Sequence, residues 1–289
     1  MNVDQPPPTI PVRIITPHSG LEGFRAAIRE LVTEFPQARR LAWRFFLRDT
    51  RAAHRQSLLG YLWLVLPALA VTLVWVFLNN QDVIDIDSGP VPYPIFVLCG
   101  TILWGAFNGS LVAMLGIVNE AKGLLSKVNF PREALVYSAL LKSLTESLIP
   151  TLLLVPAVWF FPVPWQPAML LFLLALLACL LLGAGIGLIL VPLATLYSDV
   201  SRGAQLLLRF GFFFTPVIFK LPAEGAARTL MSLNPVTPLI VSGRAWFVGT
   251  GDAMSAAFFA VIGLTALAVA LGLVAFKVVL PQLIERVSA

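Results

Sequence analysis

Long uninterrupted apolar runs are the feature of this sequence that most restricts its fold. The run AMLLFLLALLACLLLGAGIGLILVPLA, residues 168–194, contains no Asp, Glu, Lys, Arg or His. An α-helix needs about 20 apolar residues to cross about 30 Å of hydrocarbon, and this run exceeds that length. Of the 289 residues, 58% are hydrophobic and 12% are charged, against about 25% charged in an ordinary soluble domain. We therefore expect an integral membrane protein.

Helices are the expected form of every membrane crossing. No segment shows the alternation over about ten residues that is typical of outer-membrane barrel strands. Backbone groups in hydrocarbon must be satisfied within the segment itself, which leaves helices as the remaining solution. The sequence thus predicts an all-α integral membrane fold with six transmembrane helices, at 58–79, 93–118, 134–161, 168–194, 204–219 and 254–276.

Positive charges indicate how these spans are oriented. Sixteen of the 20 Lys and Arg lie before the first span, in the stretches 119–133 and 196–209, or in the C-terminal tail. The connections on the other side hold none, apart from three in the long stretch 219–254. Lys and Arg near span ends are retained on the cytoplasmic side. Both termini are therefore expected in the cytoplasm.

The chain before the first span divides into two parts. Residues 1–20 are rich in Pro, which prevents a stable helix, and are expected to be a disordered tether. Residues 21–57 repeat apolar side chains at helical spacing and predict two amphipathic interface helices, with Pro36 ending or bending the first. Residues 58–289 then form the transmembrane domain with a short cytoplasmic tail.

The second interface helix carries arginines among aromatic side chains, as a helix at the headgroup level would. Its candidate residues for contact with a charged head are Arg44, Arg48, Arg51 and Arg55. Binding to anionic lipid or to a cytoplasmic partner explains the same pattern.

Residues for catalysis or metal binding are not evident in the sequence. There is no GxxxxGK[ST] phosphate loop, and the two histidines, His18 and His54, both precede the first span. Cys99 and Cys179 fall inside predicted spans and indicate neither a disulfide nor a metal site. The glycines of GAGIG, residues 183–187, are typical of close helix contacts. We expect no enzyme activity, no cofactor and no nucleic-acid partner for this chain.

Two sets of residues within the spans have open interpretations. Lys142 and Glu146 share one face of the third span, as a buried pair or as substrate contacts. Aromatic side chains exceed what interface belts require, and they either face lipid or line a path for sugar rings. The candidates for such a path are Trp75, Trp104, Phe107, Phe210 and Phe214.

The connection 219–254 is expected to form an outer gate. Proline interrupts the fifth span in FFFTPVIFKLP, and the apolar run in LNPVTPLIVSGR is too short to span. Such segments are re-entrant, because irregular backbone at membrane depth needs protein or water around it. The candidate gate residues are Pro216, Asn234, Pro235 and Pro238.

Four motifs in order carry a family resemblance. The segments RDTRAAHRQSLLGYLW, YPIFVLCGTILWGAFNGSL, KVNFPRE and LNPVTPLIVSGR resemble the interface helix, second span, first cytoplasmic loop and re-entrant segment of ABC-type polysaccharide export permeases. These permeases are type-2 ABC transporters.

The resemblance implies a homodimer in a bacterial inner membrane, with two copies of a cytoplasmic ATPase that binds ATP and Mg²⁺. The substrate would be a lipid-linked polysaccharide, such as O antigen, capsule or teichoic acid. Its negatively charged head would bind the arginines of the interface helix. The first cytoplasmic loop would dock into the ATPase through Lys127, Asn129, Phe130, Pro131, Arg132 and Glu133.

Two other classes of transporter remain as alternatives. An ABC-type exporter of small amphiphiles or drugs would need a similar number of helices. A secondary transporter would show internal repeats and charged midplane sites, and no repeat is evident.

Overall fold

A computed structural model describes residues 21–54, 58–84, 86, 88, 91–125, 130–161, 163–250 and 254–288. The expected tether, residues 1–20, lies outside these ranges. No strand occurs in the described part of the chain, which confirms the predicted all-α class. In chain order its elements are α1 (Leu21–His54), α2 (Leu62–Asn80), α3 (Tyr93–Leu125), α4 (Glu133–Thr151), α5 (Leu154–Phe160), the 3₁₀ turn η1 (Pro167–Leu170), α6 (Leu171–Leu196), α7 (Ser198–Gly211), α8 (Ala226–Leu233), α9 (Val236–Val248) and α10 (Ser255–Ser288).

Among the described residues, five helical stretches are long and apolar enough to cross a membrane, so the chain is a multi-pass membrane protein. They correspond to the first, second, third, fourth and sixth predicted spans, with shifts of a few residues at their ends. The third is built from α4 and α5, and the fourth from η1 and α6. Their bounds are Leu62–Asn80, Tyr93–Leu125, Glu133–Phe160, Pro167–Leu196 and Ser255–Val279.

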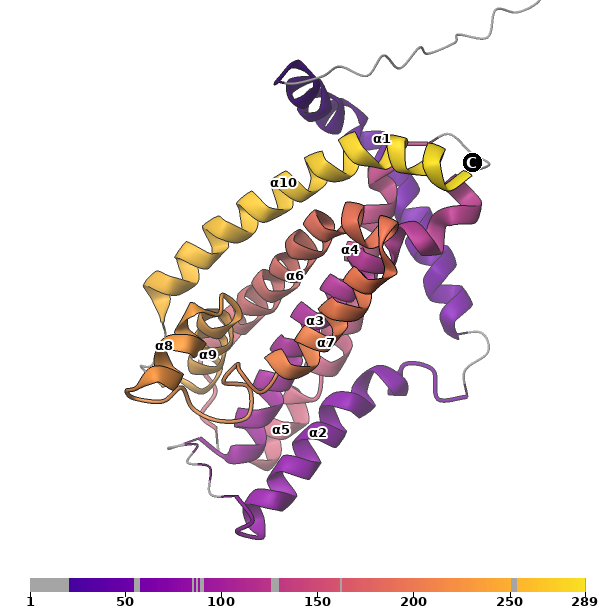
Figure 1. The fold of residues 1–289 in the computed structure, drawn as a ribbon. Helices are drawn as coiled ribbons and strands as arrows, with labels where there is room; N and C mark the ends of the chain where they lie inside the picture. The colour runs from indigo at the N-terminus through magenta and orange to yellow at the C-terminus, as the bar shows by residue number, and fades with distance from the viewer. Residues whose placement is uncertain are drawn as a thin grey trace, which may run out of the picture.

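The fifth predicted span differs from the prediction. A helix was expected over 204–219, whereas α7 begins at Ser198 and ends at Gly211. Its 14 residues reach about 21 Å, which is less than the hydrocarbon thickness. The ring of Pro216 would clash with the carbonyl of a helical residue four positions earlier, so the helix ends before Phe212. Together, α7 and the turns after it lead from the end of α6 to the end that carries α8 and α9 (Figure 1).

The core lies where α3 contacts α6. Phe96, Leu103 and Phe107 of α3 are buried in one apolar cluster with residues of α6. A methyl group at Gly183 of α6 would clash with the Phe107 carbonyl oxygen, and one at Gly187 would lie 2.7 Å from Met114 Cβ. The glycine cluster thus permits close helix contact, as its sequence indicated.

The N-terminal amphipathic segment is one helix rather than two. α1 continues through Pro36, so this proline does not end the helix, which was one of the two predicted effects. Proline removes the hydrogen bond to the carbonyl four residues earlier, at Val32. The Val32 side chain is exposed, so its carbonyl lies on a solvent-facing side of the helix and can be hydrated. α1 packs against α4 and α10, at the end opposite to α8 and α9 (Figure 1).

Candidate functional site

One lysine and three glutamates join three helices at the end of the bundle that carries α1. Lys277 Nζ, on α10, lies 2.7 Å from Glu133 Oε1 in the first turn of α4. It also donates a hydrogen bond of 3.0 Å to Glu34 Oε2 on α1, and Glu30 Oε2 lies 3.4 Å away. The ammonium group therefore holds α1 and the beginning of α4 against α10.

Burial makes this cluster more than a surface ion pair. The side chain of Glu133 is 4% exposed and that of Lys277 is 13% exposed. Charges shielded from water are costly unless each has a partner, so these two groups depend on each other. The sequence predicted Glu133 as a coupling residue but counted Lys277 only as a positive charge. The position of Lys277 at the end of an apolar span could have indicated a structural role. Its glutamate partners are distant in sequence and become evident only in the fold.

The predicted ATPase-coupling residues begin outside the described part of the chain, because Lys127 and Asn129 belong to the undescribed stretch 126–129. Phe130 is half-buried, and its ring meets that of Phe45 edge-on, with centroids 5.6 Å apart. It also packs against a small group of alanines from α1 and α4, which are Ala38, Ala42 and Ala134. Phe130 thus attaches the loop to the chain's own interface helix.

Pro131 and Arg132 follow Phe130 as half-buried residues, and α4 begins at Glu133. The loop therefore ends at the buried lysine and glutamate cluster. Any force on this loop would reach α1 and α10 within a few residues.

The predicted headgroup residues lie on the outward side of α1. Arg44, Arg48 and Arg51 are exposed, and Arg55 lies outside the described residues. Arg48 Nε donates a hydrogen bond of 2.7 Å to Asp49 Oδ1, and its guanidinium carbon is 5.2 Å from the Phe45 ring centroid. One arginine of the set is thus held by the helix itself.

A cavity of about 450 Å³ opens between α1, α3 and α4 beside Arg48. Lys142 on α4 and Glu120 on α3 also line it, together with the apolar side chains of Ile117 and Leu135. The cavity combines two cations, Arg48 and Lys142, and two carboxylates, Asp49 and Glu120, with an apolar wall, which suits a molecule that has a polar head and an apolar chain.

At the opposite end, Arg244 on α9 organises the turn after α7. One of its terminal nitrogens donates hydrogen bonds of 2.7 Å to the Pro216 carbonyl and 2.9 Å to the Val217 carbonyl. Its guanidinium lies 3.5 Å from the centroid of the Phe96 ring, so a cation–π contact adds to these bonds. A methyl group at Gly100 would clash with the Val217 carbonyl oxygen, so this position must stay small.

Three further hydrogen bonds fix the predicted gate residues at this end. Asn234 Nδ2 donates to Thr215 Oγ1 at 2.7 Å, and the Val236 amide donates to Asn234 Oδ1 at 3.0 Å. Tyr93 Oη on α3 donates to the Ile218 carbonyl at 3.2 Å. Pro216 is thereby bound to the corner where α8 meets α9.

Pro235 caps α9 and Pro238 is buried inside it, so all four predicted gate residues share this end of the molecule. Sequence reasoning did not single out Arg244. It is the one charged residue of α9, within an otherwise apolar run, and that isolation was the signal.

The aromatic candidates for a substrate path fall into two groups. Trp104 and Phe107 are 8% and 6% exposed, and Trp104 packs edge-on against Phe212 with centroids 6.2 Å apart. Trp75 is half-buried against the same core. Phe210 and Phe214 are 59% and 53% exposed. Of the five candidates, Phe210 and Phe214 therefore present the most aromatic surface to a partner or ligand.

The structure is thus a helical membrane domain with a basic amphipathic helix at one end and two short helices at the other. Residues 36–248 match the family model described as ABC-2 type transporter, which is well over half of the 289 residues. The chain therefore belongs to the ABC-2 type transporter family. It is a membrane permease that supplies the transport function and is not itself the ATPase.

The chain is also similar to one characterised member of this kind of transporter. Over 222 residues the chain is 28% identical to the O-antigen export system permease protein RfbA of Myxococcus xanthus. The aligned region covers 75% of this chain and 84% of that protein. The family resemblance predicted from four motifs is confirmed.

Proposed function

We propose that this permease exports a lipid-linked polysaccharide, O antigen or a similar envelope glycan, from the cytoplasmic side of a bacterial inner membrane. The similarity to a protein named as an O-antigen export permease, over 75% of this chain, is the observation that carries the proposal. The cavity beside α1 and the exposed aromatic pair support an amphiphilic substrate that contains sugar rings.

The working unit in this proposal is a homodimer with two ATPase subunits that bind ATP and Mg²⁺. α3 and α6 pack closely together in one apolar core, so we expect the substrate path to lie elsewhere than between these two helices. In the apolar helix α2, by contrast, Thr72 is the one buried residue, so much of its apolar surface stays accessible. Two copies around one axis would cover part of this surface and place a path between them.

Coupling would start at the cytoplasmic loop that ends at Phe130. The ring contact with Phe45 and the ion pairs of Glu133 link this loop to α1 and α10. ATP-driven closure of the partner subunits would move the loop, and these contacts would transmit the motion to the helices. A segment anchored at its base transmits force better than a flexible one.

The substrate head would bind on the interface helix. Arg44, Arg48 and Arg51 offer planar groups that suit a pyrophosphate, and Lys142 adds a cation inside the neighbouring cavity. The glycan would then pass along the exposed aromatic side chains, since rings of this kind bind sugar faces without strong preference for one sugar. α8 and α9 would close the outer end at rest.

Deletion of the gene in its own host tests this function. We expect the lipid-linked glycan to accumulate on the cytoplasmic face and to disappear from the cell surface, with recovery on expression of the wild-type chain. An Arg202→Gln variant, changed at an exposed position of α7, should restore export equally well.

The second candidate is an ABC-type exporter of small amphiphiles, favoured by the modest size of the cavity beside α1. That function predicts unchanged surface glycan and increased sensitivity to amphiphilic compounds in the deletion strain. Normal glycan at the surface would reject polysaccharide export.

A further inference from the structure

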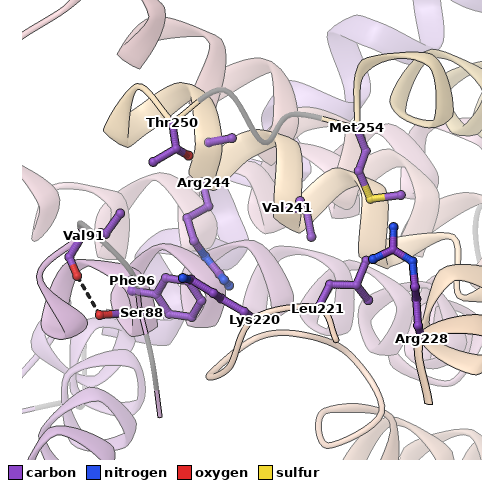
Figure 2. Close-up of a pocket in the computed structure, with 11 residues that line it drawn as sticks. Ser88, Val91, Phe96, Lys220, Leu221, Arg228, Val241, Arg244, Thr250 and Met254 are labelled. Atoms are coloured by element: carbon purple, nitrogen blue, oxygen red, sulfur yellow. Dashed lines mark hydrogen bonds between the residues drawn. The ribbon is translucent and has the colours of Figure 1, made fainter. Parts of the chain in front are cut away.

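A second cavity, of about 330 Å³, lies at the end of the bundle that carries α8 and α9 (Figure 2). Its volume is at the lower end of the range for small-ligand sites, which is about 300–1,000 Å³. Residues from α3, α8, α9 and the segments before α3 and α10 line it, so it forms only when this end of the chain is assembled.

Three cationic side chains surround this cavity. Arg244 and Lys220 lie on one side of it and Arg228 on the other (Figure 2). No Asp or Glu is among the described residues that line it. The guanidinium groups of Arg228 and Arg244 both line this space, and an anion between them would accept charge-assisted hydrogen bonds from both.

The two arginines are held in place and still have donors available. Arg244 uses one terminal nitrogen on the Pro216 and Val217 carbonyls, and its Nε is buried without a hydrogen-bond partner among the described residues. One terminal nitrogen of Arg228 donates to the Pro222 carbonyl at 2.9 Å. Each guanidinium has five N–H donors, so both retain capacity for a ligand.

From these observations we infer that the cavity binds the phosphate or pyrophosphate group of a lipid. Arginine forks match the oxygens of a phosphate, and the hydroxyl of Thr250 offers a further donor. Val241 and Met254 form an apolar wall beside the charges, which suits the stem of a lipid more than a free ion. The site concerns binding at the outer end and does not depend on which substrate is exported.

A bound phosphate would also connect elements that the chain joins only by loops. Arg228 belongs to α8, Arg244 to α9 and Lys220 to the segment after α7. A lipid phosphate between them would stabilise the closed arrangement of this end.

Binding to the purified full-length permease in neutral detergent tests the inference. Three phosphate probes are titrated by calorimetry: a short-chain phosphatidylglycerol, a short-chain isoprenyl pyrophosphate and inorganic phosphate, with phosphatidylcholine as the lipid without net charge. We expect saturable binding of at least one anionic lipid. The Lys220→Gln/Arg228→Gln double variant should bind it at least about tenfold more weakly, because each charge-assisted bond contributes strongly.

The matched control is Arg202→Gln, which removes one positive charge at the opposite end of the molecule and should leave the affinity unchanged. Lys220, Arg228 and Arg202 are all exposed, so the variants should fold normally, which size-exclusion chromatography checks.

The probes also separate two sources of the ligand. Preference for phosphatidylglycerol indicates a resident phospholipid, and preference for the isoprenyl pyrophosphate indicates the head of an exported lipid. Binding of inorganic phosphate alone, no saturable binding, or equal affinity in the double variant and the control would each overturn the inference.

Discussion

At the scale of single residues, two buried cations stabilise opposite ends of the molecule by different means. Lys277 is neutralised by carboxylates from α1 and α4. Arg244 is held by two backbone carbonyls and the face of Phe96. A compact ammonium suits the centre of several carboxylates, whereas a planar guanidinium can bond in its plane and stack on a ring at the same time.

Replacing Lys277 should destabilise the protein through the partner it leaves behind. The Lys277→Met variant leaves Glu133 buried without its cation, which costs about 3 kcal/mol of stability. Thermal unfolding in detergent should show a midpoint lower by several degrees. Adding Glu133→Gln to this variant should recover part of the loss.

The control for this prediction is Lys122→Met, because Lys122 is exposed at the same end of the bundle. Its midpoint should stay close to that of the wild type. Equal midpoints for the Lys277 and Lys122 variants would show that the cluster contributes no stability.

The glycines of α6 allow a matched test of helix contact. In Gly183→Ala the new methyl would clash with the backbone of α3 at Phe107, so about 1–3 kcal/mol should be lost. Gly263 on α10 has no atom within 4 Å of the same methyl position, so Gly263→Ala should be neutral or slightly stabilising. Thermal midpoints of the two variants in one detergent measure the difference, and a Gly183→Ala midpoint as high as that of Gly263→Ala would contradict close contact.

At the scale of elements, hydropathy correctly predicted where the membrane-spanning helices occur. Helix ends near prolines were predicted less accurately. The first four predicted spans and the sixth are present as helices in the structure, because the length and apolarity of a segment are enough to identify a membrane-spanning helix. The two prolines have opposite effects on helix length. α1 continues through Pro36, whereas α7 ends before Pro216. The difference depends on tertiary surroundings, which a single sequence does not show.

The candidate sites were predicted less completely than the helices. Asn234 and Pro216 were both predicted as residues of the outer gate, and the fold brings them together through Thr215. Arg244 and Lys277 acquire their roles from partners 27 and 243 positions away, a separation at which local patterns carry no information.

The loop before α4 provides a prediction at this scale. Phe130→Asp should abolish stimulation of the partner ATPase by the permease while the chain still inserts in membranes, because the ring of the proposed docking loop is lost. The same substitution also breaks the ring contact with Phe45.

Phe45→Ala separates the two explanations, since it removes this contact from the α1 side and leaves the loop intact. ATPase stimulation measured in proteoliposomes should survive in Phe45→Ala if Phe130 docks into the ATPase. Equal loss in both variants would mean that α1 attachment, rather than docking, limits coupling.

At the scale of the whole molecule, exposed apolar surface shows that one chain is an incomplete unit in water and needs lipid or a second copy around it. α2 presents most of its length to the surroundings, and Phe210 and Phe214 extend from the α7 region. In the proposed homodimer, Phe210 and Phe214 lie along a path between the two copies. If lipid alone surrounds the chain, it covers these two side chains and α2 alike.

Thiol labelling distinguishes these arrangements. The native Cys99 and Cys179 are fully buried, so they give little background. Phe210→Cys and Phe214→Cys should react with a water-soluble thiol reagent during ATP turnover, because a hydrated glycan path admits the reagent. Phe259→Cys on α10 is similarly exposed and should react only with a lipid-soluble reagent. If Phe210→Cys and Phe214→Cys both behave like the Phe259→Cys control, these aromatics face lipid, and the path between copies must be sought on other helices.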